Sequence, residues 1–349
     1  MLAQDSRWIG DALLSARKSS GWLPLLLVGH SARIVYEGSI LVRSADPDVG
    51  VPQVAQVLAD RFADVIARSR HGGKFLDDNK KSFDDLRLEM LTFVEVHRDE
   101  FLGNAVWFAR WFESDIGVCL GPQNRVLTTT ITTHFRTGLG DGVPISEAGS
   151  ALFSVAESLG QALGSFAQLG RHRQPIESTI DYRPLGRIRD VDRRVSTYAA
   201  GRYDDAMDLA TKLLILMVEG EVNTARQVIS LGAQAHPDAT FRARFISLYH
   251  SLRAVEEVLR LPQLTTASGT QRVRSLLAEK RVRRFLDDAG LKKVRNRCMH
   301  YEIRDRSISL DPALPMFGIV EGLSVLTFDE LDGELQAVTE QLSDALQRW

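Results

Sequence analysis

The stretch LKKVRNRCMHYEIRDR at residues 291–306 combines apolar residues at helical spacing with a group of arginine, asparagine and histidine. An α-helix turns by about 100° per residue, so one narrow arc of such a helix holds Leu291, Val294, Cys298 and Tyr301. This arc predicts the side that packs into a protein core. The opposite side holds Arg295, Asn296, Met299 and His300. We expect that side to face solvent, another domain or a second subunit.

The residues around this stretch have the pattern of a helical bundle. Amphipathic segments follow one another from residue 203 to the end of the chain, and short segments with Gly, Pro, Ser or Thr separate them. The last segment begins with a capping-box pattern, Thr327 followed three residues later by Glu330. These features predict an all-α bundle over residues 191–349.

The first half of the chain has a mixed pattern. Residues 22–45 and 125–137 are rich in β-branched residues, which favours strands. Helical spacing is found in residues 54–69, 83–114 and 146–170. We therefore expect both helices and strands here.

Residues 171–190 contain two prolines and a glycine without a sustained period, which is typical of a linker. The sequence therefore predicts an α+β protein with a mixed α/β domain of unknown role at 1–170, this linker, and the bundle at 191–349. A chain of 349 residues is long enough for two domains.

The composition, with 44% hydrophobic and 25% charged residues, is that of a soluble globular protein. Cys119 and Cys298 are too few for a disulfide framework or a zinc site, so we expect a reducing, cytoplasmic compartment. The apolar run at 22–28 is too short to span a membrane. The histidines show no metal-ligand spacing, and we expect no metal or other cofactor.

Charge is strongly polarised along a chain whose net charge is only −2. Residues 271–306 carry 12 Lys/Arg and 5 Asp/Glu, whereas residues 307–349 carry 1 Arg and 8 acids. A basic segment of this kind predicts contact with phosphates, over a short length of nucleic acid.

The pattern Arg-Asn-x-x-x-His, seen as RNRCMH at residues 295–300 and late in a helical bundle, resembles the signature of the HEPN superfamily. The resemblance covers about residues 195–349. A second Arg-to-His spacing, Arg244 to His250, lacks the asparagine. Many HEPN proteins are metal-independent endoribonucleases that act as dimers, with the two motif helices facing each other across a cleft.

The resemblance implies an RNA-cutting site in a toxin or defence-type effector. His300 would be the general acid/base, and Arg295 would stabilise charge on the phosphate. Asn296 would orient either the histidine or the phosphate. The residues that would hold the RNA backbone are Lys292, Lys293, Arg297 and Arg304.

The resemblance also implies a homodimer through the bundle, because one motif supplies only one arginine and one histidine. An antitoxin or activator is a further possible partner. An alternative stays open, in which the bundle is a non-catalytic RNA- or protein-binding module and the N-terminal domain is a sensor.

Overall fold

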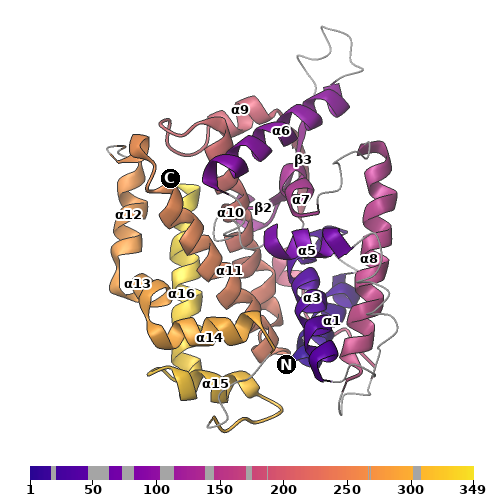
Figure 1. The fold of residues 1–349 in the computed structure, drawn as a ribbon. Helices are drawn as coiled ribbons and strands as arrows, with labels where there is room; N and C mark the ends of the chain where they lie inside the picture. Colours follow the sequence, from indigo (N-terminus) through magenta and orange to yellow (C-terminus); the bar gives the residue numbers. More distant parts are fainter. Residues whose placement is uncertain are drawn as a thin grey trace.

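The chain is mostly helical, with one small sheet (Figure 1). The computed structural model describes residues 1–16, 21–45, 63–72, 82–102, 114–137, 145–169, 175–186, 188–265, 267, 269–301 and 308–349. The described helices of the first half are α1 (Leu2–Ala16), α2 (Leu23–Leu26), α3 (Val28–Ala45), α5 (Ala63–Gly72), α6 (Phe83–Leu102), α7 (Thr130–Thr137) and α8 (Ile145–Ala167). Those of the second half are α9 (Val195–Ala200), α10 (Leu209–Gln227), α11 (Pro237–Val258), α12 (Thr270–Ala278), α13 (Lys280–Asp287), α14 (Ala289–Met299), α15 (Pro315–Leu323) and α16 (Phe328–Gln347).

The sheet has three antiparallel strands in the order β2-β1-β3. The strands are β1 (Ile116–Leu120), β2 (Val126–Thr129) and β3 (Arg189–Arg193). The class α+β is therefore confirmed as a mostly helical chain with a small sheet. β3 begins inside the predicted linker and ends inside the predicted all-α bundle.

α10 lies at the centre of the second half and contacts β2, α11 and α16 (Figure 1). It is buried over nearly its whole length, because the sheet covers one side and helices cover the others. α16 begins as predicted, with the Thr327 backbone N–H 2.9 Å from a Glu330 carboxylate oxygen and the Glu330 N–H 3.3 Å from the Thr327 hydroxyl. α15 has no counterpart among the predicted segments.

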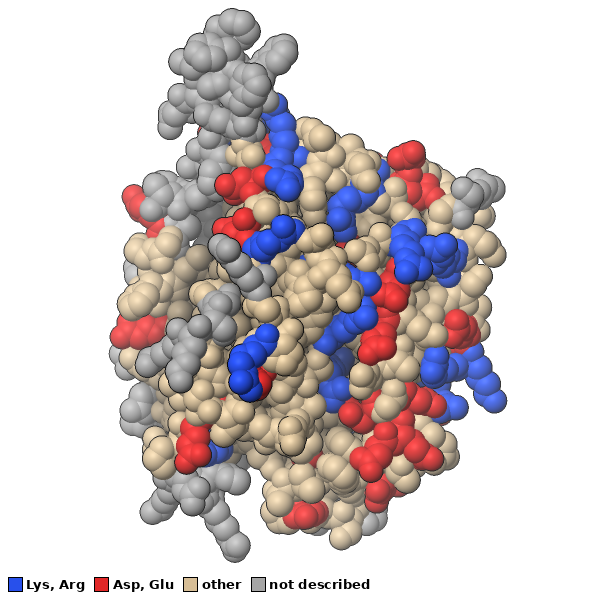
Figure 2. All heavy atoms as spheres, turned by 180° about the vertical axis from the view of Figure 1, so that it is seen from behind, with Lys and Arg blue, Asp and Glu red and all other residues tan. Residues whose placement is uncertain are grey.

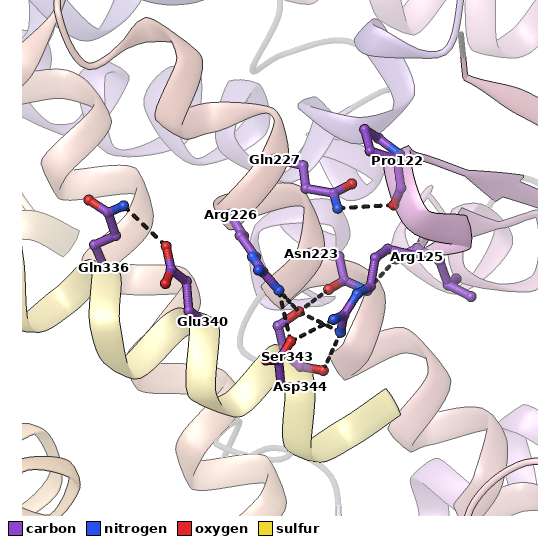
Figure 3. Close-up of polar contacts among 10 residues, drawn as sticks. Pro122, Arg125, Asn223, Arg226, Gln227, Gln336, Glu340, Ser343 and Asp344 are labelled. Carbon is purple, nitrogen blue, oxygen red and sulfur yellow. Dashed lines mark hydrogen bonds and ion pairs between the residues drawn. The ribbon is translucent and has the colours of Figure 1, made fainter. Parts of the chain in front are cut away.

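A polar cluster ties α16 to the sheet and to α10 (Figure 3). Arg125, in the turn before β2, and Arg226 of α10 both donate to Oδ1 of Asp344, over 2.5 and 3.0 Å. The neighbouring Ser343 hydroxyl donates to Oδ1 of Asn223 over 2.6 Å. These bonds, of which the two to Asp344 are charge-assisted, fix the C-terminal helix against elements from both halves of the chain.

The prediction of strands over residues 22–45 is wrong, because this segment forms α2 and α3. Gly38 shows the physical reason. A Cβ at this position would lie 2.7 Å from the Leu2 side chain and 2.8 Å from Phe166, so the glycine lets α3 pack closely against α1 and α8. Tertiary packing therefore overrides the β-propensity of the segment.

The other predictions for the first half are met in part. Residues 125–137 form β2 and then α7, so the strand there is shorter than expected. The helix over 146–170 is confirmed as α8, and α5 and α6 lie within the predicted helical ranges except for the last residues of α5. Residues 54–62 and 103–113 lie outside the described residues.

Among the described residues, the interior contains two hydrophobic clusters, and each takes residues from both sides of the predicted linker. The first joins α6 and the sheet to α10, α11 and α16. The second joins α1, α3 and α8 to parts of α10 and α11. The two parts of the chain therefore share their packing, and their division into separate folding units stays a prediction. None of the helices in the described ranges is long and apolar enough to cross a membrane.

Candidate functional site

The predicted motif helix is α14, which lies between α11 and α15. It begins at Ala289, where the Asp288 side chain accepts a hydrogen bond from the Leu291 N–H over 2.8 Å. Gly290 lies against the backbone carbonyl of Leu323, the last residue of α15, and a Cβ there would clash with it. The cap and the glycine together set where the helix starts.

The predicted packing arc is correct in its burial, since Leu291, Val294, Cys298 and Tyr301 are all buried. Burial raises the pKa of the Cys298 thiol to about 12, so this thiol is neutral and unreactive. The placement of Met299 on the outer side is wrong. α14 ends at Met299, whose side chain is buried and lines a small internal cavity.

His300 lies just beyond the end of α14. Its backbone is extended (φ −120°, ψ 148°), while its N–H still donates to the carbonyl of Asn296 over 3.0 Å. The helical wheel therefore does not apply to His300. Its side chain is 50% exposed and points toward α3 of the N-terminal half.

The imidazole of His300 is held by a buried carboxylate, Glu37 of α3. The distance between His300 Nδ1 and Glu37 Oε2 is 2.8 Å. The other carboxylate oxygen accepts from Arg70 Nε over 2.7 Å. Burial raises the pKa of Glu37 most, but the bond from His300 and the charge of Arg70 outweigh it, and the pKa lies below its usual value. An ionised Glu37 only accepts hydrogen bonds, so His300 donates from Nδ1.

A pocket of about 520 Å³ opens between α3 and the end of α14. Its described lining consists of Glu37, Ile40, Leu41, Ser44, Asn296, Arg297, His300 and Tyr301. Three of the predicted site residues, Asn296, Arg297 and His300, are thus brought to one place. This pocket is the candidate functional site.

Arg295 is not part of the described pocket lining. Its guanidinium lies over the ring of Tyr249 in α11, 4.6 Å from the ring centroid. Its Nε is buried and has no hydrogen-bond partner among the described residues. The structure therefore separates Arg295 from the pocket formed by Asn296, Arg297 and His300.

The basic segment is partly neutralised by contacts within the protein. Arg283 forms ion pairs with Glu256 and Asp287, and Arg284 forms one with Glu334. Lys292 and Lys293 are exposed, and the described part of the chain shows no ion pair for either. Arg304 lies outside the described residues.

The face seen from behind in Figure 2 shows basic and acidic side chains interleaved, with several acidic residues gathered at its lower right. The described residues form no continuous basic surface on this face. Phosphate contacts are therefore not favoured over the breadth of this face.

The end of α14 is anchored to α1 and α3 by buried ionic contacts. Arg33 of α3 donates to the carbonyl of Cys298 over 3.1 Å and to Oδ2 of Asp5 over 3.0 Å. The Tyr301 hydroxyl donates to the same Asp5 oxygen over 2.8 Å. The guanidinium of Arg242 lies over the Tyr301 ring, 4.6 Å from its centroid. These contacts fix the residues on both sides of His300.

A buried polar cluster around a second, small cavity includes Arg70, which also bonds to Glu37. Glu221 of α10 forms an ion pair with Arg136 and accepts from the Ser247 hydroxyl. The cavity there is about 30 Å³, which is room for one water. The Ser247 hydroxyl and the Glu221 carboxylate both approach the same nitrogen of His30, Nε2, over 3.4 and 3.5 Å. A nucleophilic triad needs the two ring nitrogens to serve different partners, so this cluster does not have the geometry of a triad.

Sequence reasoning did not find Glu37 or Arg70. Glu37 is the only charged residue in IVYEGSILV at 34–42, and a lone acid in an apolar helix must find a partner to be buried. LLILMVEGEV at 213–222 carries a similar signal, with two buried acids, Glu219 and Glu221, in an apolar helix. Neither pattern names the partner, which lies far away in the sequence.

Comparisons with family models, with curated proteins and with solved structures found no match to this chain. The geometry of the site is therefore the basis for assigning a function.

Proposed function

We propose that the chain is a metal-independent endoribonuclease of the HEPN type and that His300 is its catalytic histidine. One observation carries the proposal. The ring of His300 is held at Nδ1 by an ionised carboxylate and is half exposed at a pocket that Asn296 and Arg297 also line. This is the arrangement of a general base with a group that orients it.

The proposed reaction needs no metal. The 2′-OH of one nucleotide attacks the adjacent phosphorus, the bond from phosphorus to O5′ breaks, and the products are a 2′,3′-cyclic phosphate and a 5′-OH. His300 takes the proton of the 2′-OH at Nε2, since Nδ1 is occupied by Glu37. The leaving O5′ needs a proton from a second group, which supports a site composed of two copies of the chain.

The pocket geometry supports roles for Arg295 and Arg297 that differ from those expected from the sequence. Arg297 lines the pocket and is the better candidate to stabilise charge on the phosphate, because a guanidinium matches phosphate geometry. Arg295, stacked on Tyr249, is the better candidate for a support of α14. Lys292 and Lys293 are exposed and remain the proposed backbone contacts.

The alternative function is an RNA- or protein-binding module that breaks no bond. The observation that favours it is the packing of Arg295 against Tyr249, which removes the first residue of the expected motif from the pocket. In that case His300 would contribute to binding like its basic neighbours.

Purified protein incubated with mixed RNA in EDTA tests the proposal. We expect cleavage by the wild type and a loss of about 100-fold or more in His300→Ala, which removes the proton-transfer group. His236→Ala is a matched control, because His236 Nε2 lies 2.8 Å from Oδ2 of Asp11 in another His–carboxylate pair. We expect this control to cleave like the wild type. A wild type that binds RNA but cuts none would contradict the nuclease and favour the binding module.

A further inference from the structure

We propose that Glu37 is a positioning residue for His300, so that helix α3 of the N-terminal half completes the catalytic site. The proposal rests on the proposed nuclease function. It adds a role for a residue outside the bundle that carries the motif.

Both oxygens of the Glu37 carboxylate accept hydrogen bonds, one from His300 and the other from Arg70. Oε2 accepts from His300 Nδ1 over 2.8 Å, and Oε1 accepts from Arg70 through both Nε and Nη2. Arg70, on α5, also lies over the ring of Tyr36, 4.4 Å from its centroid. These contacts hold the carboxylate between α5 and the end of α14.

Burial excludes a direct chemical role for Glu37. Its side chain is 5% exposed and that of Arg70 is 9% exposed, whereas His300 is 50% exposed. Oε1 is turned to Arg70 and Oε2 to His300, so His300 is the group of the pair that is exposed at the pocket. Glu37 therefore acts through His300.

The contact selects one tautomer of His300. A neutral imidazole carries its proton on either nitrogen, and only a ring with the proton on Nδ1 donates to Glu37. The lone pair is then on Nε2, the nitrogen left for a ribose hydroxyl. Removal of a carboxylate that orients a histidine in this way lowers activity through the wrong tautomer while the fold is preserved.

Glu37→Gln separates this role from simple packing. The amide has nearly the same size and can still bond to His300, but its NH₂ group donates, which favours the proton on Nε2. Glu37→Asp keeps the carboxylate and shortens the side chain. Glu89→Gln is the matched control, since Glu89 forms an ion pair with Arg68, two residues from Arg70 on the same helix.

The test uses the full chain with ¹⁵N-labelled histidine, whose ring nitrogen signals distinguish the two neutral tautomers. The His300 signals are assigned from their absence in His300→Ala. We expect the proton on Nδ1 in the wild type, in Glu89→Gln and in Glu37→Asp, and on Nε2 in Glu37→Gln. The same tautomer in the wild type and in Glu37→Gln would overturn the inference.

RNA cleavage is measured on the same proteins. We expect kcat to fall by about 10- to 100-fold in Glu37→Gln, with KM changed by less than about twofold, and to recover in part in Glu37→Asp. A tautomer switch with unchanged kcat would also overturn the positioning role. If the tautomers behave as expected but the wild type cuts no RNA, the proposed nuclease function fails, while the contact of Glu37 with His300 stands.

Discussion

The hydroxyl of Tyr301 donates to Oδ2 of Asp5 over 2.8 Å, although the two residues are 296 positions apart. Asp5 is fully buried, and the same oxygen lies 3.0 Å from Arg33 and 3.1 Å from Arg242. Tyr301 directly follows His300. The first helix of the chain therefore sets the position of the residue next to the proposed catalytic histidine.

Tyr301→Phe should lower the free energy of unfolding by about 1–2 kcal/mol, because the variant lacks one buried hydrogen bond while the ring stays between its neighbours. Asp5→Ala should cost more, about 3–5 kcal/mol, since Arg33 and Arg242 are buried and both lose their ion pair with Asp5. Urea unfolding of both variants measures the difference. Equal decreases in the two variants would show that Asp5 is not the counter-ion of this cluster.

Asp238→Asn should stabilise the protein at neutral pH. Burial raises the pKa of Asp238 to about 6, from an ordinary value of 3.8, a difference of about 3 kcal/mol in favour of the protonated form. The folded state therefore binds this proton more tightly than the unfolded state, and the contribution to stability is lost as the pH rises from about 4 to 6. An asparagine avoids this loss and can still accept from the Met316 N–H.

The measurement for Asp238 is the difference in unfolding free energy between the wild type and Asp238→Asn at several pH values. We expect no advantage of the variant near pH 4 and an advantage of up to about 3 kcal/mol above pH 6. A constant difference across this range would contradict the raised pKa.

Lys292→Ala and Lys293→Ala should weaken RNA binding and reduce its salt dependence by about one unit for each phosphate that the protein no longer neutralises. Arg284→Ala removes the same charge from the same basic segment, but Arg284 is bound to Glu334 over 2.8 Å. We therefore expect this variant to keep the salt dependence of the wild type. Filter binding at several salt concentrations compares the three. Equal slopes for all three variants would contradict a role of the exposed lysines.

Light scattering should give a mass of about twice 38.9 kDa at micromolar protein, because the composite site needs two copies of α14. The specific cleavage rate should fall steeply on dilution as the dimer dissociates. A monomer that cleaves RNA at an unchanged specific rate would contradict the composite site and leave a site within one chain.

Much of the helical second half is predictable from the sequence, because apolar spacing there is regular and the Thr327 cap is explicit. The helix α3 is not predictable in this way, because its residues favour strands. The close approach of Leu2 and Phe166 to Gly38 shows why a helix packs there. Local propensity does not contain that information.

Some residues of the candidate site are predictable from the sequence and others are not. Asn296 and His300 come from a local pattern, and the structure brings both to one pocket with Arg297. Glu37 lines that pocket and Arg70 holds its carboxylate, through tertiary contacts across the chain that no local pattern specifies. Met299 and His300 also show that a helical wheel fails where the helix ends.

The most direct measurement of the central claim is the chemistry of the cut ends. A short RNA is incubated with the full chain in EDTA, beside the same RNA with 2′-O-methyl groups, and the products are identified by mass. Attack by the 2′-OH with His300 as base predicts 2′,3′-cyclic phosphate and 5′-OH ends, no cutting of the methylated RNA, and about 100-fold less product or lower from His300→Ala. Products with 3′-OH and 5′-phosphate ends, or cutting of the methylated RNA, would contradict the account.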